Sequence, residues 1–266
     1  MLTSKVALIT GGARGIGAGI ARTMASEGSR VALLDLDGVE AEKTAAGLST
    51  PGMAVACDVA VETDVAAAVQ TVVERFGGLD ILVNNAGVGR PVGRSGRMDD
   101  MSAADWDEQL AQDLRTAFVT TKAAAPHLKA RGGGAIVNIS SITGLVASAT
   151  QPAQAAAKAG MISLTKSLAL DYAPHDIRVN AICPGFVWSR PWERLTAGLK
   201  QTVPAFADLD ARGIFLEVVK RAVPLGREQT VEDIGRLAAF LASDAARNIT
   251  GQWIAVDGGI TLRQAQ

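Results

Sequence analysis

Short apolar runs rich in β-branched residues alternate with longer segments of helical pattern, and this alternation constrains the fold more than any other feature. The near-continuous apolar character of the runs indicates strands that are covered on both faces, as in a parallel sheet. The predicted strands are residues 5–10, 30–35, 53–59, 79–84, 135–140, 178–183 and 253–256. The predicted helices are residues 15–27, 39–47, 62–76, 103–129, 152–172 and 231–243. The pattern therefore predicts a doubly wound α/β fold, a parallel sheet of about seven strands with helices on both faces.

Length and composition favour one domain that spans residues 1–266, since 48% of the residues are hydrophobic and can bury one large core. The 26 basic and 27 acidic residues nearly cancel, so we expect neither nucleic acid nor a membrane surface as a partner. No apolar stretch approaches the ~20 residues that cross a bilayer. The first residues also lack an apolar signal region, and we expect a cytoplasmic protein.

Cysteine and histidine usage gives little sign of redox or metal chemistry. Cys57 and Cys183 lie in apolar runs, where a small buried side chain is more typical than a disulfide or a metal ligand. His127 lies near a helix end and His175 in a connection, and we expect neither to take part in chemistry. We expect no metal site.

Two helix starts and one insertion stand out in the second half of the chain. Ser102 precedes Asp105 by three residues, and Thr230 precedes Asp233 in the same way, which is the capping-box spacing. Residues 190–221 form an insertion that we expect to be the least regular part of the chain. Its apolar side chains suit either a lid over substrate or packing against a second subunit; they are Trp192, Leu195, Leu199, Phe206, Phe215 and Leu216.

A glycine-rich segment, residues 10–17 (TGGARGIG), directly follows the first predicted strand and opens the first helix. In that context glycines let backbone amides approach a pyrophosphate, whose charge the helix N-terminus stabilises. Asp35 ends the second strand, where a carboxylate accepts hydrogen bonds from a ribose diol and repels a 2′-phosphate. The pair favours NAD over NADP, although Arg14 is able to meet a phosphate.

Further motifs extend this pattern over nearly the whole chain. They are residues 10–17, Asp58-Val59, residues 84–87 (NNAG), residues 138–141 (NISS), Lys158, Pro184-Gly185 and residues 257–259 (DGG). In this order the set resembles the short-chain dehydrogenase/reductase family. The resemblance implies a Rossmann-type fold, an NAD cofactor, a small-molecule substrate and a homotetramer or dimer.

The resemblance also implies roles for individual residues in holding the cofactor. Asp58 and Val59 would hold the adenine, residues 85–87 would line the adenosine ribose, and Lys158 would bond the nicotinamide ribose. Ser189 matches a hydroxyl that binds the nicotinamide amide. The expected cofactor residues are Gly11, Arg14, Gly15, Ile16, Gly17, Asp35, Asp58, Val59, Asn85, Ala86, Gly87, Lys158, Pro184, Gly185, Val187 and Ser189.

The chain departs from the family pattern at the residue that normally transfers a proton. The family has a tyrosine four residues before the lysine and a serine thirteen residues before that tyrosine. Ser141 is present, but Gln154 stands in the tyrosine's place, and an amide is neither an acid nor a base near neutral pH. The only tyrosine, Tyr172, lies fourteen residues after Lys158, about 21 Å along a continuous helix.

A second departure lies in the helix that begins near residue 103. Asp113 replaces the asparagine that in the family helps to hold a water near the lysine. We weigh two interpretations: Asp113 is a plain structural substitution that points away, or it pairs with Lys158 directly or through water. In the second case its charge would make a water nucleophilic or supply a base. The expected catalytic residues are Ser141, Gln154, Lys158 and Asp113.

Three functions remain open. The first is an NAD-dependent oxidoreductase with an altered proton path, acting on a mid-sized alcohol or ketone. The second is redox-neutral chemistry, such as hydrolysis, elimination or dehalogenation, with water positioned by Asp113 and Gln154. The third is a protein that is not an enzyme in its own right, either a nucleotide-binding subunit that stabilises an active partner or a catalytically disabled variant of a dehydrogenase. On the substrate side, Arg90, Arg94 and Arg97 suit either recognition of a carboxylate or phosphate, or an ordinary solvated loop balanced by Asp99 and Asp100.

Overall fold

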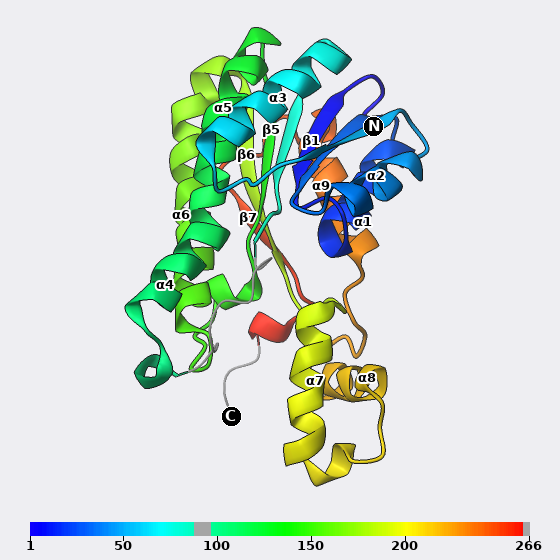
Figure 1. Ribbon diagram of the computed structural model, residues 1–266, viewed down its shortest axis with the longest axis vertical. Helices are drawn as coiled ribbons and strands as arrows, with labels where there is room; N and C mark the ends of the chain where they lie inside the picture. The colour runs from blue at the N-terminus through cyan, green and yellow to red at the C-terminus, as the bar shows by residue number, and fades with distance from the viewer. Residues whose placement is uncertain (88–96, 263–266) are drawn as a thin grey trace.

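A computed structural model describes residues 1–87 and 97–262, and its centre is one sheet of seven parallel strands (Figure 1). The spatial order is β3-β2-β1-β4-β5-β6-β7. The strands are β1 Val6–Thr10, β2 Arg30–Asp35, β3 Gly52–Ala56, β4 Ile81–Asn84, β5 Gly134–Ile139, β6 Ile177–Pro184 and β7 Trp253–Val256. The predicted parallel sheet is confirmed, although β3 ends at Ala56 and not at residue 59.

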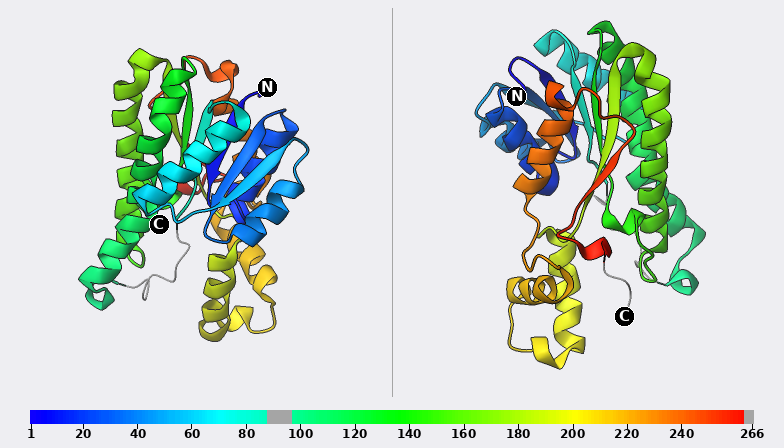
Figure 2. Two further views of the ribbon diagram at one scale, coloured as in Figure 1. Left: turned by 45° about the horizontal axis from the view of Figure 1, so that its top comes forward. Right: turned by 180° about the vertical axis from the view of Figure 1, so that it is seen from behind.

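Helices cover both faces of the sheet (Figure 2). One face packs against α1 (Gly15–Ser26), α2 (Gly38–Ala46) and α9 (Val231–Ala242). The other face packs against α3 (Glu62–Phe76), α5 (Thr116–Ala130) and α6 (Pro152–Tyr172). The predicted helix pattern is therefore confirmed for these elements. Within the described ranges, no helix is both long and apolar enough to traverse a bilayer.

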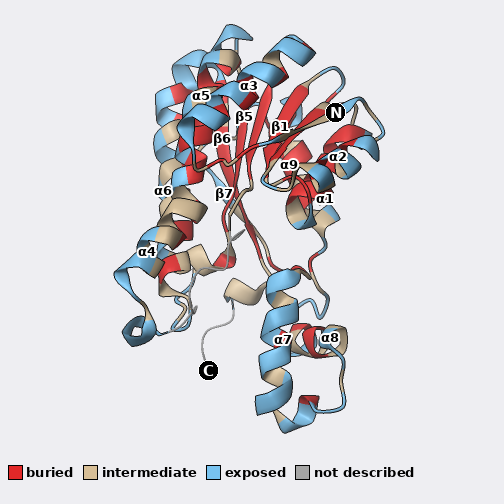
Figure 3. Cartoon of the chain, in the orientation of Figure 1, coloured by how far each residue is buried: buried red, intermediate tan, exposed pale blue. Residues whose placement is uncertain are grey.

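Both faces of the central strands are buried, which explains their continuous apolar character (Figure 3). Along β1, Ala7 and Ile9 join the core beneath α1 and α9, while Val6 and Leu8 join the core beneath α3 and α5. Successive strand side chains point to opposite faces, so each strand residue here meets a helical layer. Cys57 and Cys183 are also buried and free, as expected.

The helix predicted over residues 103–129 is three elements in the structure. The helix α4 (Ala103–Leu110) runs into a π-helical turn at Ala111–Arg115, which continues as α5. π-Turns are rare and occur frequently at functional sites. Both predicted capping boxes, at Ser102 and at Thr230, are confirmed.

The insertion at residues 190–221 is regular, contrary to expectation, because it forms α7 (Arg190–Thr202) and α8 (Ala211–Ala222). We call these two helices the α7–α8 lobe; Figure 1 shows it below the carboxyl ends of the strands. Its own small core explains the regularity: the Trp192 ring packs edge-on against Phe186 and Phe215, with centroids 4.9 and 4.8 Å away. Of the apolar side chains that suggested a lid or a subunit contact, Trp192 and Phe215 therefore pack on one another, while Leu195 and Leu216 are exposed.

Candidate functional site

The strand order reverses between β1 and β4, and a crevice at such a point is where open α/β sheets bind ligands. Two loops leave the sheet there and are tied together. The Thr10 hydroxyl accepts hydrogen bonds from the amides of Asn85 and Ala86, at 3.1 and 3.0 Å. In return, the Asn85 amide donates to the carbonyls of Thr10 and Gly11, both at 3.0 Å. The expected cofactor residues at 11–17 and 85–87 therefore meet.

Glycines keep the first of these loops open. Gly11 has φ +64°, a conformation that favours glycine, and a Cβ on Gly17 would lie only 2.1 Å from the Gly11 carbonyl oxygen. Gly15 begins α1, so the unpaired amides of the first helical turn face this loop, beside the half-buried Ile16. The cradle suits a phosphate, and side chains on these glycines would fill it.

Asp35 is held rigidly at the end of β2. One of its carboxylate oxygens accepts from the Ala13 amide at 2.9 Å, and the other accepts from the Asp37 amide at 3.0 Å. Next to this carboxylate, the Arg14 guanidinium donates to Asp37 at 2.7 Å and lies 3.5 Å from Glu40. These contacts were not predicted, although the sequence Asp35-Leu36-Asp37 placed a second carboxylate nearby.

The adjacent strand brings Asp58 and Val59 to the same edge. The Cys57 amide donates to the Asp35 carbonyl at 2.9 Å, which aligns the end of β3 with the end of β2. Asp58 accepts from the Ala60 amide at 3.0 Å, and Val59 is buried. The expected adenine-side residues thus lie beside the expected ribose carboxylate.

A buried ion pair forms the second part of the site. The Lys158 ammonium on α6 lies 3.2 Å from a carboxylate oxygen of Asp113 on the π-turn, and it donates to the Ile139 carbonyl at 3.3 Å. Asp113 is fully buried and Lys158 is 6% exposed. The other Asp113 oxygen accepts a hydrogen bond from Gln109. Of the two interpretations of Asp113, the structure therefore supports the one in which Asp113 pairs directly with Lys158.

Gln109 is a residue that the sequence reasoning missed. It lies four residues before Asp113, a spacing that puts the two side chains on the same helical face, so a signal was available. Its amide fixes one carboxylate oxygen and leaves the other to face Lys158.

The loop that follows β4 closes directly over the ion pair. A Cβ on Gly87 would lie 2.3 Å from the Asp113 oxygen that faces Lys158. The expected cofactor loop and the expected catalytic pair are therefore in contact, and only glycine fits between them.

Ser141 and Gln154 lie on two elements that pack together, the short helix Ile142–Gly144 and α6. Ser141 caps the short helix Ile142–Gly144, and its hydroxyl accepts from the Thr143 amide at 3.1 Å. That helix packs on α6, since a Cβ on Gly144 would lie 2.7 Å from the Lys158 carbonyl carbon. Gln154 is half-buried one helical turn before Lys158, on the same face of α6. Tyr172 ends α6 and stacks under Lys129, at 5.1 Å, so it does not reach this site.

The residues after β6 border the α7–α8 lobe. Pro184 ends the strand, and a Cβ on Gly185 would lie 2.7 Å from the Asp257 backbone. Val187 pairs with Gln229, and Ser189 stands before the first turn of α7. Burial raises the pKa of the neighbouring Cys183 thiol to about 11, which keeps the thiol protonated.

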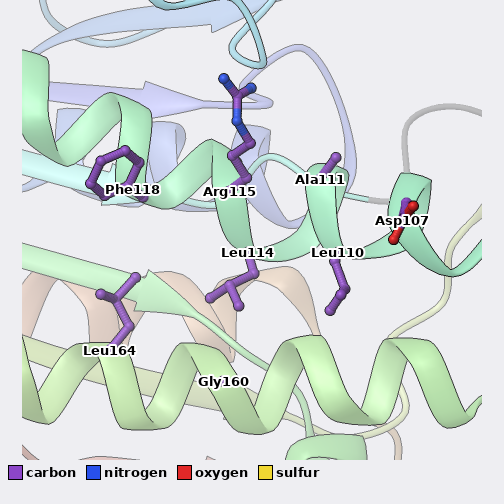
Figure 4. Close-up of a pocket in the computed structure, with 8 residues that line it drawn as sticks. All are labelled: Asp107, Leu110, Ala111, Leu114, Arg115, Phe118, Gly160 and Leu164. Carbon is purple, nitrogen blue, oxygen red and sulfur yellow. The ribbon is translucent and has the colours of Figure 1, made fainter.

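An apolar groove of about 470 Å³ lies along the outer side of the π-turn and α6 (Figure 4). Its described lining is Asp107, Leu110, Ala111, Leu114, Arg115, Phe118, Gly160 and Leu164. Phe118 is 48% exposed. Because Asp113 points inward from the same turn, the groove is separate from the ion pair. Of the predicted loop arginines, Arg97 is exposed, while Arg90 and Arg94 lie outside the described residues.

Comparisons with known proteins place the chain among oxidoreductases over nearly its whole length. The family described as enoyl-(acyl carrier protein) reductase matches residues 11–261. Oxidoreductase UcpA of Escherichia coli O157:H7 is 44% identical over 265 residues, which cover 98% of this chain and 96% of the relative. The 2-(S)-hydroxypropyl-CoM dehydrogenase 3 of Xanthobacter autotrophicus is 40% identical over 264 residues, which cover 98% of each. A Burkholderia xenovorans crystal structure described as a short-chain dehydrogenase/reductase has a TM-score of 0.86 at 36% identity and covers 99% of both chains.

Proposed function

The chain belongs to the short-chain dehydrogenase/reductase family, and we propose that it is an NAD-dependent oxidoreductase that interconverts an alcohol and a ketone without a catalytic tyrosine. The observation that carries this proposal is the buried pair of Lys158 and Asp113 next to the glycine-rich crevice. The similar dehydrogenase that acts on 2-(S)-hydroxypropyl-CoM supports a mid-sized organic alcohol as the substrate.

The residues present fit a dinucleotide. The loop at residues 11–17 would hold its pyrophosphate, and Asp35 would accept hydrogen bonds from the adenosine ribose, for which its fixed orientation is suited. Asp58, Val59 and residues 85–87 would complete the adenosine side. Pro184, Gly185, Val187 and Ser189 would border the nicotinamide side. When bound, such a cofactor supplies or accepts the hydride.

Lys158 and Asp113 would handle the proton. The Lys158 ammonium would give a proton to the oxygen of a ketone and would take it back from an alcohol. Asp113 stabilises the charged amine, because its carboxylate lies 3.2 Å from the ammonium nitrogen in a buried site. Gln154 and Ser141 would orient the substrate oxygen by hydrogen bonding. Gln154 would do so with its amide N–H, from the sequence position that a tyrosine holds in the family pattern.

The test is turnover with NAD or NADH across small secondary alcohols, hydroxy acids such as D-3-hydroxybutyrate, and the matching ketones, followed by NADH absorbance. Asp113→Asn and Lys158→Met should lower kcat by about 10²- to 10⁴-fold, the usual worth of general acid–base catalysis. Asp99→Asn removes an exposed carboxylate from the short helix Met98–Asp100 and should leave kcat unchanged. Wild-type turnover in Asp113→Asn would remove Asp113 from the proton path.

A second candidate is redox-neutral chemistry at the same site. It is favoured by one observation: the Asp113 oxygen that faces Lys158 makes no hydrogen bond among the described residues, so it has a lone pair for a water. Turnover of a halohydrin or an ester with no net change in NADH absorbance would support this candidate over the first.

We also propose a homo-oligomer that buries the apolar groove of Figure 4. An exposed ring such as Phe118, at the edge of a groove lined by leucines, is typical of a surface that another chain covers. Light scattering of the wild type and of Phe118→Asp tests this, since the substitution should yield monomers.

A further inference from the structure

Two neighbouring segments beside the ribose carboxylate are joined by a second, exposed ion pair. Asp35 accepts the amides of Ala13 and Asp37, and the next residue along, Arg14, reaches across to the Asp37 side chain at 2.7 Å. Glu40 approaches the same guanidinium nitrogen at 3.5 Å. Arg14 is therefore held by two carboxylates at the edge of the nucleotide crevice.

This arrangement matters because an arginine at this place is what accommodates the 2′-phosphate of NADP in dinucleotide folds. A phosphate adds up to two negative charges, which a nearby cation has to balance. Among the residues that the structure describes, Arg14 is a cation in direct contact with this edge. Its guanidinium already forms ion pairs with Asp37 and Glu40.

We propose that Asp37, assisted by Glu40, is a specificity-determining residue that withholds Arg14 from the 2′-phosphate and so secures NAD over NADP. The inference rests on the proposed dinucleotide site and deepens it. Asp35 excludes the phosphate by repulsion, whereas Asp37 binds the guanidinium of Arg14 that would otherwise compensate for that repulsion. The two carboxylates thus act on different partners.

The roles of the two carboxylates are separable by mutation. Asp35 is bonded to two backbone amides, so its loss would also disturb the glycine-rich loop. Asp37 contributes its other oxygen to the cap of α2, where it accepts from the Glu40 amide at 3.1 Å. Asparagine caps helices about as well as aspartate, so Asp37→Asn removes the charge that binds Arg14 and keeps the helix start.

The experiment is titration calorimetry with AMP and with adenosine 2′,5′-bisphosphate, which differ only by the 2′-phosphate. Asp37→Asn should tighten binding of the bisphosphate by about five- to tenfold, the effect of one unit charge a few ångströms away in a solvated site. Its affinity for AMP and for NAD should change by less than about twofold, since neither carries the added charge. Glu40→Gln should give a smaller gain, because Glu40 is farther from Arg14 and is shared with Lys43.

Two controls separate the release of Arg14 from a general change in charge. Glu217→Gln breaks a similar arginine–glutamate pair on α8 and changes the net charge equally, so it should not affect the ratio of the two affinities. In Asp37→Asn with Arg14→Gln, the gain should disappear. A gain that persists without Arg14, or an unchanged ratio in Asp37→Asn with normal NAD binding, would overturn the inference. Failure of the wild type to bind NAD or AMP would overturn the proposed dinucleotide site, and the inference with it.

Discussion

Asp113→Ala should destabilise the fold as well as the chemistry, because it leaves the Lys158 ammonium without its charge partner. Removing one member of a buried pair typically costs about 3–5 kcal/mol. We expect the lower end, ~3 kcal/mol, because Lys158 keeps the Ile139 carbonyl as a hydrogen-bond acceptor. In a chain of about this size, Tm falls by about 2–4 °C for each kcal/mol of unfolding free energy that is lost. A loss of ~3 kcal/mol therefore corresponds to a fall in Tm of roughly 6–12 °C.

The assay is thermal and urea unfolding followed by circular dichroism at a fixed protomer concentration, since association would also stabilise the fold. The matched control is the double variant Asp113→Ala with Lys158→Met, which removes both charges. It should be more stable than Asp113→Ala alone, because no unpaired charge remains buried. A loss below about 1 kcal/mol in the single variant, or a double variant that is less stable still, would refute a buried ion pair at this position.

Three further predictions follow from individual side chains. Gln154→Tyr should restore a proton donor one turn before Lys158 and raise turnover of an accepted alcohol by about 10²-fold or more, as measured by NADH absorbance. No gain would mean that the site has been remodelled for another proton path. The Cys183 thiol, whose pKa burial raises to about 11, should resist iodoacetamide in the native protein at about pH 8, where an ordinary thiol is partly ionised; mass spectrometry of the native protein would reveal any labelling. Burial alone would raise the pKa of Asp257, but hydrogen bonds from Thr261 and Gly259 outweigh burial and lower the pKa. The ionised carboxylate therefore stabilises the fold above its unfolded pKa of about 3.9, and this stabilisation is lost as pH falls through the lower folded pKa. Asp257→Asn should make the free energy of unfolding less dependent on pH in that window.

The sheet and most helices could be predicted because their signals are local. Each strand is buried on both faces, so its sequence is a continuous apolar run, and Ser102 and Thr230 carry their capping partners three residues away. The glycine-rich loop could be predicted for the same reason, since Gly11 and Gly17 meet conformational demands set by the turn itself.

Features that depend on tertiary contacts could not be predicted in this way. The π-turn at Ala111–Arg115 has no distinctive amino-acid composition that would predict it. The structure shows it together with the burial of Asp113. The regularity of the α7–α8 lobe depends on aromatic residues that find their partners across segments, as Trp192 does with Phe186 and Phe215. The contact of Arg14 with Asp37 joins two loops that are far apart in sequence but adjacent across β1 and β2.

The site pairs a cation with a carboxylate at two places, and the difference in burial predicts different sensitivities to salt. Lys158 and Asp113 are shielded from solvent, whereas the side chains of Arg14 and Asp37 are 41% and 44% exposed. At about 0.1 M salt the screening length is ~10 Å, and it shortens to ~3 Å at 1 M. We therefore expect the preference for AMP over adenosine 2′,5′-bisphosphate to weaken as sodium chloride is raised, because Asp35, Asp37 and Glu40 act through solvent. The stability lost in Asp113→Ala should change little over the same range. If both effects declined together, the Lys158–Asp113 pair would be open to solvent, and its proposed role in moving a proton away from bulk water would fail.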